Sequence, residues 1–170
     1  FFCPENFLIE FMTYQIVLKI GLCGLTFSYY LSRRFATKDL RIVWFSVLYA
    51  MSGYIAAYNW NHMWMDCIFL APLIILGLEE LVVKGKCRLY CVTLTASIFT
   101  NYYLSILICI FLVLYFAMQL FTNGLSLKEK GRALLQFAVS SLLSGGVASV
   151  LLLPVMNAMS VTAFHDISFP

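Results

Sequence analysis

The sequence predicts an all-α fold, namely a polytopic transmembrane helical bundle with about six spans. Of its 170 residues, 62% are hydrophobic and only 11% are charged, whereas a soluble domain has about 25% charged residues. The mean hydropathy is +0.90. Lys and Arg are concentrated in three short stretches between apolar runs. The lipid bilayer is therefore the first expected partner, and no basic patch suits a nucleic acid.

Six apolar runs can each supply a membrane helix, because the hydrocarbon core of a bilayer is ~30 Å thick and takes about 20 helical residues. The fourth run is short and meets the fifth at Asn101, so these two form either two full spans or a shallow hairpin. We interpret residues 1–170 as a single transmembrane domain and as a piece of a longer protein, because they begin without an initiator Met or a leader peptide. The expected spans are 8–31, 42–58, 67–83, 89–100, 103–121 and 133–156.

The connections between these spans alternate between basic and non-basic. Ten of the eleven basic residues lie in 33–41, 84–88 and 128–132, which follow the first, third and fifth spans. The connection 58–66 and the turn at Asn101 contain no Lys or Arg. The positive-inside bias places the basic loops in the cytoplasm, and the connection 58–66 and both chain ends outside. The alternation predicts an unbroken up-and-down path across the membrane.

The connection 58–66, which we call the polar rim, contains most of the candidate site residues. It places amides, an imidazole, indoles and a carboxylate between two strongly apolar runs, and such groups near hydrocarbon are costly enough to indicate a functional site. Asn59, Asn61 and His62 offer donors and acceptors for sugar hydroxyls or for a metal-bound phosphate. No metal site is expected from the protein alone, because His62 and Asp66 are only two ligands. The cofactor is left unknown, with a divalent metal as an open alternative.

Three rim residues have two interpretations each. Trp60 and Trp64 suit an aromatic belt at the level of the lipid head groups, or they stack on the apolar face of a sugar ring. Asp66 suits the N-cap of the third span, where it would favour the helix dipole. Alternatively, it is a carboxylate that holds substrate or takes part in acid-base chemistry.

Lys19 is the one basic residue outside the three loops. It follows Glu10 by nine residues and so lies ~13 Å deeper along the first helix. An intramembrane lysine is a candidate for binding a phosphate or carboxylate head group. The alternative is that its long side chain reaches up to the interface or pairs with a structural carboxylate.

Two further patterns indicate packing. Glu79 and Glu80 precede the basic loop 84–88 and are expected to pair with its lysines. Ser141, Gly145 and Ser149 recur at four-residue spacing in the last span. Such a small-residue ridge lets another helix approach closely.

Five pieces of the first two thirds of the chain carry a family resemblance. The most specific is the rim itself, with Asn-Trp-Asn at 59–61 followed by Met63, Trp64 and Asp66. In these pieces the sequence resembles the bacterial membrane protein YfhO family, multi-span proteins placed with the GT-C type of glycosyltransferase. The other pieces are Leu18-Lys19-Ile20-Gly21-Leu22 with Gly24-Leu25-Thr26, Tyr49-Ala50-Met51-Ser52-Gly53-Tyr54, Pro72-Leu73-Ile74-Ile75-Leu76-Gly77-Leu78-Glu79 and Asn101-Tyr102-Tyr103.

The resemblance implies a fragment of a GT-C-like module in a bacterial cell membrane. Such an enzyme takes a sugar from a polyprenyl-phosphate carrier and transfers it, on the outer face, to a cell-envelope acceptor such as teichoic acid. GT-C enzymes usually carry their principal carboxylate in the first outer loop, which would precede Phe1, so the fragment alone is expected to be inactive. Asp66 is then a secondary catalytic carboxylate. The expected substrate-binding residues are Lys19 for the phosphate, together with Asn59, Trp60, Asn61, His62, Trp64, Asn101 and Tyr102.

Two other classes of function compete with the glycosyltransferase. A transporter or flippase of a lipid-linked or anionic substrate would use Lys19 as its intramembrane charge, but the sequence shows no internal repeat of the kind that alternating access favours. A noncatalytic membrane assembly subunit would use the small-residue ridge of the last span.

Overall fold

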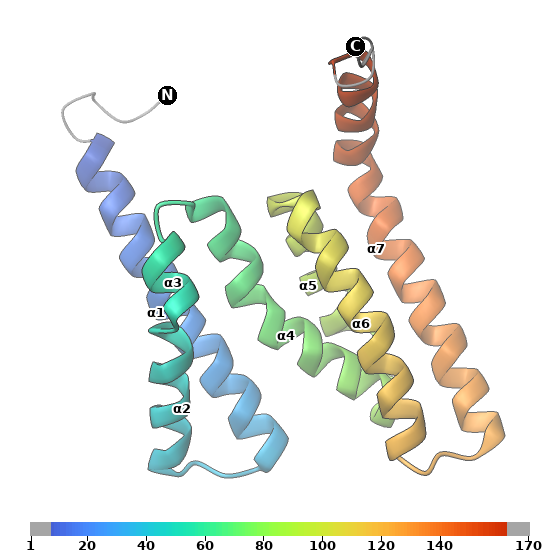
Figure 1. The fold of residues 1–170 in the computed structure, drawn as a ribbon. Coiled ribbons are helices and arrows are strands. Elements are labelled where there is room, and N and C mark those ends of the chain that lie inside the picture. Colours follow the sequence, from blue (N-terminus) through green and yellow to red (C-terminus); the bar gives the residue numbers. More distant parts are fainter. Residues whose placement is uncertain (1–7, 163–170) are drawn as a thin grey trace, which may run out of the picture.

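The computed structural model describes residues 8–162, which form an all-helical bundle (Figure 1). The predicted fold class is therefore confirmed. The expected outer location of the two chain ends concerns residues outside the described range. The helices in chain order are α1 (Leu8–Phe35), α2 (Leu40–Ala50), α3 (Gly53–Tyr58), α4 (His62–Lys84), α5 (Arg88–Thr100), α6 (Tyr102–Thr122) and α7 (Leu127–Thr162).

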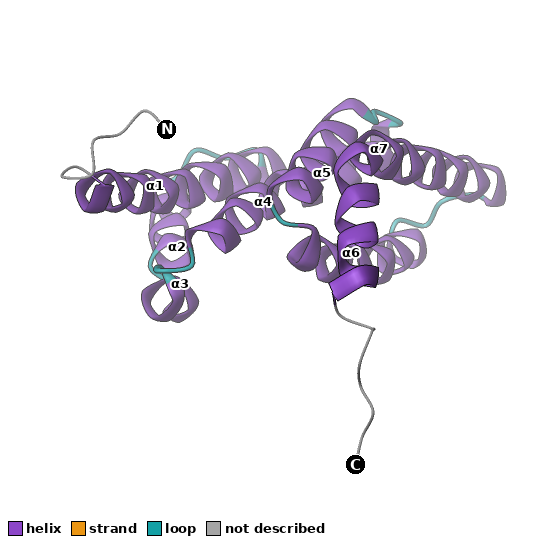
Figure 2. Ribbon diagram, turned by 90° about the horizontal axis from the view of Figure 1, so that it is seen from above, coloured by secondary structure: helices purple, strands orange, loops and turns teal. Residues whose placement is uncertain are grey.

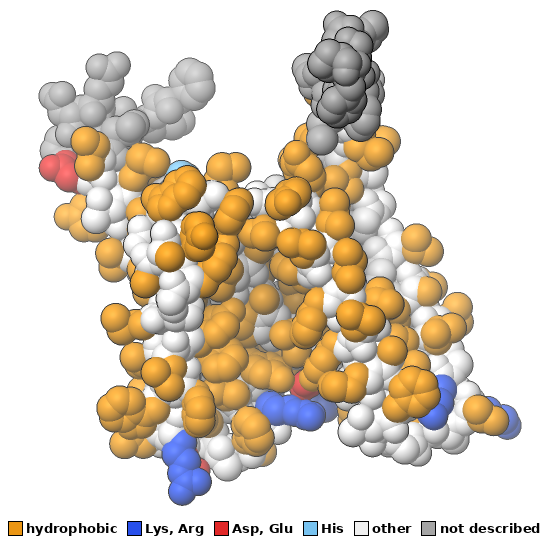
Figure 3. Space-filling model, in the orientation of Figure 1, with side chains coloured by type: hydrophobic (Ala, Val, Ile, Leu, Met, Phe, Trp, Pro, Cys, Tyr) orange, Lys and Arg blue, Asp and Glu red, His pale blue; other side chains and the backbone are white. Residues whose placement is uncertain are grey.

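The helices run up and down between two ends of the bundle (Figure 1). The connections that follow α1, α4 and α6 lie together at one end, which we call the basic end. The turns that join α3 to α4 and α5 to α6 lie at the opposite end, the rim end. The Lys and Arg side chains visible in Figure 3 gather at the basic end. This segregation agrees with the alternation of charge along the sequence.

Helix α4 is the centre of the bundle. Seen from the end, α1, α2 and α3 lie on one side of it, and α5, α6 and α7 on the other (Figure 2). Its buried face joins a core formed with α5, α6 and α7, in which Leu78 and Leu81 are fully buried beside Tyr90 and Leu112. A smaller cluster of Cys23, Ile55 and Met65 ties α1 and α3 to the first turns of α4. The rim is thus attached to the most buried helix of the fold.

The number of candidate membrane spans is about four, so the expectation of six was wrong. The four stretches that are long and apolar enough to cross a bilayer are Ile9–Phe35, Leu40–Tyr58, Tyr102–Thr122 and Leu127–Ala158. Helix α5 has 13 residues, about 20 Å, which is too short for a ~30 Å core. Helix α4 carries three carboxylates, Asp66, Glu79 and Glu80, and buries about half of its residues against other helices. The apolar side chains of α4 therefore pack against other helices inside the bundle.

The small residues of α7 pack on α5, in a register shifted by one from the predicted ridge. Ser140, Ser144 and Ala148 are buried, and the Ser144 hydroxyl donates to the Cys91 carbonyl at 3.2 Å. Of the predicted ridge, Ser141 does reach α5, because its hydroxyl lies 2.9 Å from that of Tyr90. A Cβ at Gly145 would meet nothing within 4 Å.

Gly77 is where α4 and α5 approach most closely. A Cβ at this position would stand 2.6 Å from the backbone nitrogen of Tyr90 and 2.7 Å from its Cα. We expect Gly77→Ala to destabilise the protein by about 1–3 kcal/mol, because the clash is with backbone and the two helices must separate. Thermal unfolding in detergent micelles measures this loss. Gly21→Ala is the matched control, because a Cβ there meets nothing within 4 Å; equal unfolding temperatures for both variants would contradict the prediction.

Candidate functional site

Lys19 and Asp66 form an ion pair between α1 and α4. The Lys19 Nζ lies 2.8 Å from Asp66 Oδ1, and the two side chains are 16% and 20% exposed. The same Nζ donates a hydrogen bond of 2.9 Å to the carbonyl oxygen of His62. The pair therefore brings together two residues that lie far apart in the sequence. It places an ammonium and a carboxylate, both mostly buried, at the start of α4.

The pair decides between several of the sequence interpretations. The N-cap interpretation of Asp66 was wrong, because α4 begins at His62 and Asn61 is its N-cap residue. Asp66 lies one turn inside the helix, since the rim continues as helix from residue 62 onward. The pairing of Lys19 with a carboxylate is confirmed. That contact is compatible with either a structural or a substrate-binding role.

The predicted site residues of α4 divide between two faces of the helix. His62 and Asp66 are four residues apart and share the face that meets α1, whereas Trp64 is two residues from each and lies on the opposite face. Trp64 lines a cavity of about 370 Å³ between the starts of α4 and α6 and the later part of α7. Asn101 and Tyr102 line the same cavity. Its other residues are Met63, Phe99, Thr100, Tyr103, Leu151 and Val155.

Asn101 also holds the turn at which this cavity opens. Its side-chain oxygen accepts a hydrogen bond of 3.1 Å from the backbone nitrogen of Leu104, so Asn101 caps the N-terminus of α6. The ring of Trp64 is placed by Tyr58, whose ring centroid lies 6.3 Å away. We call the cavity that Trp64, Asn101, Tyr102 and Tyr103 help to line the rim cavity.

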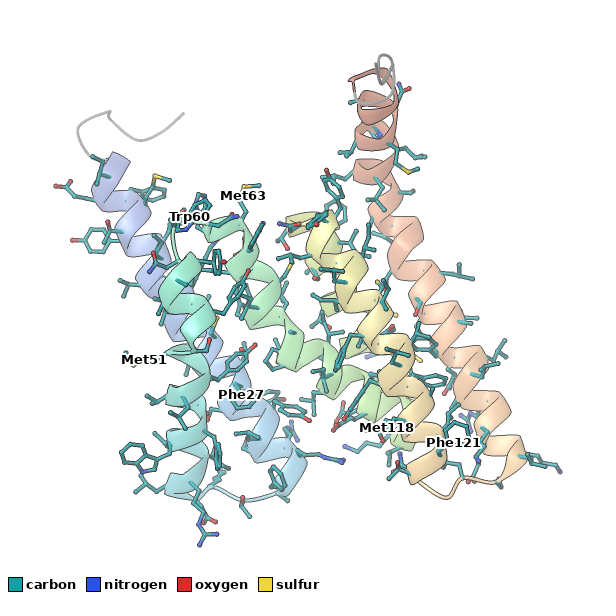
Figure 4. All side chains as sticks on the ribbon, in the orientation of Figure 1. Phe27, Met51, Trp60, Met63, Met118 and Phe121 are labelled. Atoms are coloured by element: carbon teal, nitrogen blue, oxygen red, sulfur yellow. The ribbon has the colours of Figure 1, made fainter. Side chains whose placement is uncertain are left out.

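The remaining rim residues lie between α3 and α4. Asn59 donates to the carbonyl of Ala56 at 3.3 Å, and Asn61 makes no side-chain capping bond. Trp60 is 68% exposed and lies with Met63 at the rim end (Figure 4). Asn59, Asn61 and Trp60 do not line the rim cavity.

An apolar groove runs along the bundle between α2–α3, α4 and α6. It has a volume of about 450 Å³, and Figure 3 shows the hollow between α2 and α6 with apolar side chains along it. This groove could not be predicted from the sequence, because its walls come from four helices. The lining residues are Tyr49, Ser52, Tyr54, Cys67, Ile68, Ala71, Ile74, Ile75, Leu104, Leu107, Ile108, Phe111 and Leu112.

Glu79 forms a second polar centre nearer the basic end. Its Oε1 accepts hydrogen bonds from the hydroxyls of Tyr30, at 3.1 Å, and Tyr115, at 2.6 Å. Its Oε2 lies 3.6 Å from the Arg34 guanidinium. The expected pairing of Glu79 with a lysine was wrong, whereas Glu80 does pair with Lys84, at 2.9 Å. We call Glu79, Tyr30, Tyr115 and Arg34 the Glu79 cluster.

The described residues do not converge as a metal site. Within 8–162, no group of three or more His, Cys, Asp or Glu side chains is placed to hold a metal ion. Asp66, the acidic residue of the rim, is already paired with Lys19. The donor set therefore does not fit a cation held by these residues alone.

Comparison with known proteins identifies the family. No curated protein and no solved structure matches the chain. The family model described as bacterial membrane protein YfhO matches residues 1–166, which is nearly the whole chain. The apolar helices of the chain and the position of its three basic loops at one end of the bundle agree with a multi-pass membrane protein. The chain belongs to the YfhO family of bacterial membrane proteins.

Proposed function

We propose that the protein is an integral membrane glycosyltransferase of the bacterial cell membrane. It moves a sugar from a polyprenyl-phosphate carrier to a cell-envelope acceptor, such as teichoic acid, on the outer face. The main support is the Lys19–Asp66 pair, which keeps a positive and a negative charge together at the end of the bundle that lacks basic loops. Charges placed among apolar helices are costly, and such groups usually serve a site.

The pair suits the two charge changes of sugar transfer. An acceptor hydroxyl oxygen forms a bond to the anomeric carbon while the bond from that carbon to the carrier phosphate breaks, and the hydroxyl proton passes to a base. The departing polyprenyl phosphate carries the released electron pair as negative charge. In the proposal the Lys19 ammonium holds this phosphate. Asp66, displaced from Lys19 by the phosphate, holds a hydroxyl of the sugar or of the acceptor.

The two cavities suit the other parts of the substrate. The apolar groove is long and lined mainly by aliphatic and aromatic side chains, which favours part of an isoprenoid chain by burial of apolar surface. The rim cavity combines Trp64 and Tyr102 with the amide of Asn101. Aromatic faces with a few placed polar groups are suited to a sugar ring.

The proposed orientation follows from the loop charges. The basic end is placed in the cytoplasm by the positive-inside bias, so the rim end faces outward. The carrier lipid would then present its sugar at the rim end of the bundle, where Lys19 and the rim cavity both lie. Asn59, Asn61 and His62 are assigned to the same sugar as secondary contacts.

Mass spectrometry of envelope polymers tests the activity. Cells that lack the protein are expected to lose one sugar substituent, and the wild-type gene restores it. The purified full-length protein in proteoliposomes is then expected to transfer the sugar from its polyprenyl-phosphate donor to the acceptor. An unchanged glycan profile would contradict the proposal. Loss of the sugar in cells without transfer in proteoliposomes would favour a flippase or an assembly subunit instead.

Two tryptophans provide a matched pair for the rim cavity. We expect Trp64→Ala to raise the KM for the donor or acceptor about fivefold, because stacking contributes roughly 1 kcal/mol beyond burial. Trp60→Ala removes an indole of the same size that is 68% exposed and outside the cavity, so it should leave KM unchanged. The transfer assay in proteoliposomes measures both. An unchanged KM in both variants would assign both residues to the aromatic belt and would contradict the sugar contact of Trp64.

A further inference from the structure

We propose that a notch at the basic end binds the phosphate of an anionic phospholipid head group. The notch lies between the connection from α4 to α5 and the first turns of α7, and its cavity has a volume of about 160 Å³. It is separate from the rim, and the proposal does not depend on the transfer reaction. The polar residues that line it are Lys84, Gly85, Glu129, Arg132 and Gln136. We call these five residues the basic notch.

Two nitrogen donors converge on the space beside Gly85. A Cβ at this position would stand 3.4 Å from Nε2 and 3.6 Å from Oε1 of Gln136, and 3.7 Å from Nη2 of Arg132. Gly85 caps α4 with a left-handed φ of +68°, a conformation that favours glycine and keeps this space free of a side chain. Within residues 8–162 the guanidinium of Arg132 has no carboxylate within ion-pair distance. An anion beside Gly85 would meet both donors.

The charges of the basic notch favour an anion at Arg132. Lys84, Arg132 and Glu129 line it, which leaves one net positive charge. Lys84 is paired with Glu80 at 2.9 Å. Glu129 is engaged at the start of its own helix, where its Oε2 accepts hydrogen bonds from the Ser126 nitrogen, at 2.9 Å, and hydroxyl, at 2.7 Å. Arg132 therefore keeps its planar set of donors available, and this geometry matches two oxygens of a phosphate.

The surroundings favour a lipid over a soluble anion. Leu81, Val82, Val83, Leu125 and Ala133 complete the lining of the cavity. The Val83 side chain is 62% exposed, and that of Leu127, two residues before Glu129, is 88% exposed. An acyl chain would cover such apolar surface while its phosphate meets Arg132. Basic pockets between helices at the membrane surface bind anionic head groups in this way.

Native mass spectrometry of the purified protein tests the notch. After exchange into micelles containing equal amounts of phosphatidylglycerol and phosphatidylcholine, the wild-type protein is expected to retain phosphatidylglycerol selectively. Arg132→Gln should weaken this retention about fivefold, because one cation at the membrane surface contributes an effect of that order. Lys128→Gln is the matched control, since it removes the same charge from the same helix outside the notch. Gln136→Leu should also weaken retention without any change in charge.

Three results would overturn the proposal. An equal loss of phosphatidylglycerol retention in Arg132→Gln and Lys128→Gln would show that the lipid is attracted by the overall positive charge and not by the notch. Equal retention of the two lipids by the wild-type protein would exclude selectivity for an anionic head group. Displacement of phosphatidylglycerol by glycerol 1-phosphate at the same concentration would make a soluble phosphate the ligand. Because Arg132 and Lys128 are both exposed, neither substitution is expected to disturb folding.

Discussion

Replacement of Lys19 by Met is expected to destabilise the protein by about 3 kcal/mol and to abolish sugar transfer. The substitution leaves the Asp66 carboxylate, which is only 20% exposed, without its cation. Removal of one partner from a mostly buried pair costs several kcal/mol, because the remaining charge is still desolvated. It also removes the donor of the hydrogen bond to the His62 carbonyl. Unfolding in detergent micelles gives the stability, and the proteoliposome assay gives the transfer.

A structural role and a chemical role for the pair are separated by two double variants. Lys19→Met with Asp66→Leu removes both charges, so much of the lost stability is expected to return while transfer stays absent. The double variant Lys19→Asp with Asp66→Lys keeps an ion pair but exchanges the positions of the two charges. If the pair only joins α1 to α4, the exchanged variant will recover transfer. If Lys19 holds the phosphate, the exchanged variant will fold and remain inactive, which is the outcome we expect.

The up-and-down order of the helices could be predicted because it depends on local signals. Apolar run length and the charge of each connection are read within about 20 residues of the sequence. The number of spans could not be predicted in this way. Helix α4 is as apolar as a lipid-facing helix, but that apolarity is used to bury Leu78, Leu81 and their neighbours inside the bundle. Periodicity alone does not distinguish a helix surrounded by protein from one surrounded by lipid.

The contacts of the site required the tertiary structure. Lys19 and Asp66 were both recognisable as costly residues, but 47 positions separate them, and no pattern in the sequence predicts that they meet. Trp64 and Asp66 lie close together in the sequence, and both belong to the connection 58–66. Once residue 62 begins a helix, two positions along it turn the side chain about 200° away. The rim is consequently two half-sites on opposite faces of α4.

The contacts of Glu79 could not be predicted from the sequence. A glutamate five residues before Lys84 suggests a surface pair, but its partners are Tyr30 on α1 and Tyr115 on α6. These residues are 49 and 36 positions away. Tyrosines within apolar runs give no separate signal, because they are equally common at a membrane interface.

Replacement of Glu79 by Leu is expected to destabilise the protein by about 3 kcal/mol. The side chain is only 7% exposed, and its loss leaves two part-buried tyrosine hydroxyls without their acceptor, which is a costly change among apolar helices. Glu79→Gln should cost less, because the amide oxygen can still accept from both tyrosines. Unfolding in detergent micelles measures the two variants. Glu80→Gln is the control, since its pair with Lys84, which is 53% exposed, contributes at most a few tenths of a kcal/mol.

The same substitution should also change the shape of the bundle. Tyr30 on α1 and Tyr115 on α6 both donate to the same oxygen of the Glu79 carboxylate, so the Glu79 cluster links α1 to α6. Spin labels on exposed positions of these helices, such as Leu25 and Leu114, are expected to report a longer or broader distance in Glu79→Leu than in Glu79→Gln. An unchanged distance together with an unchanged unfolding temperature would show that the bundle is held without the cluster. The apolar groove is lined in part by α4 and α6, which this cluster joins, so we expect its width to depend on Glu79 even though Glu79 does not line it.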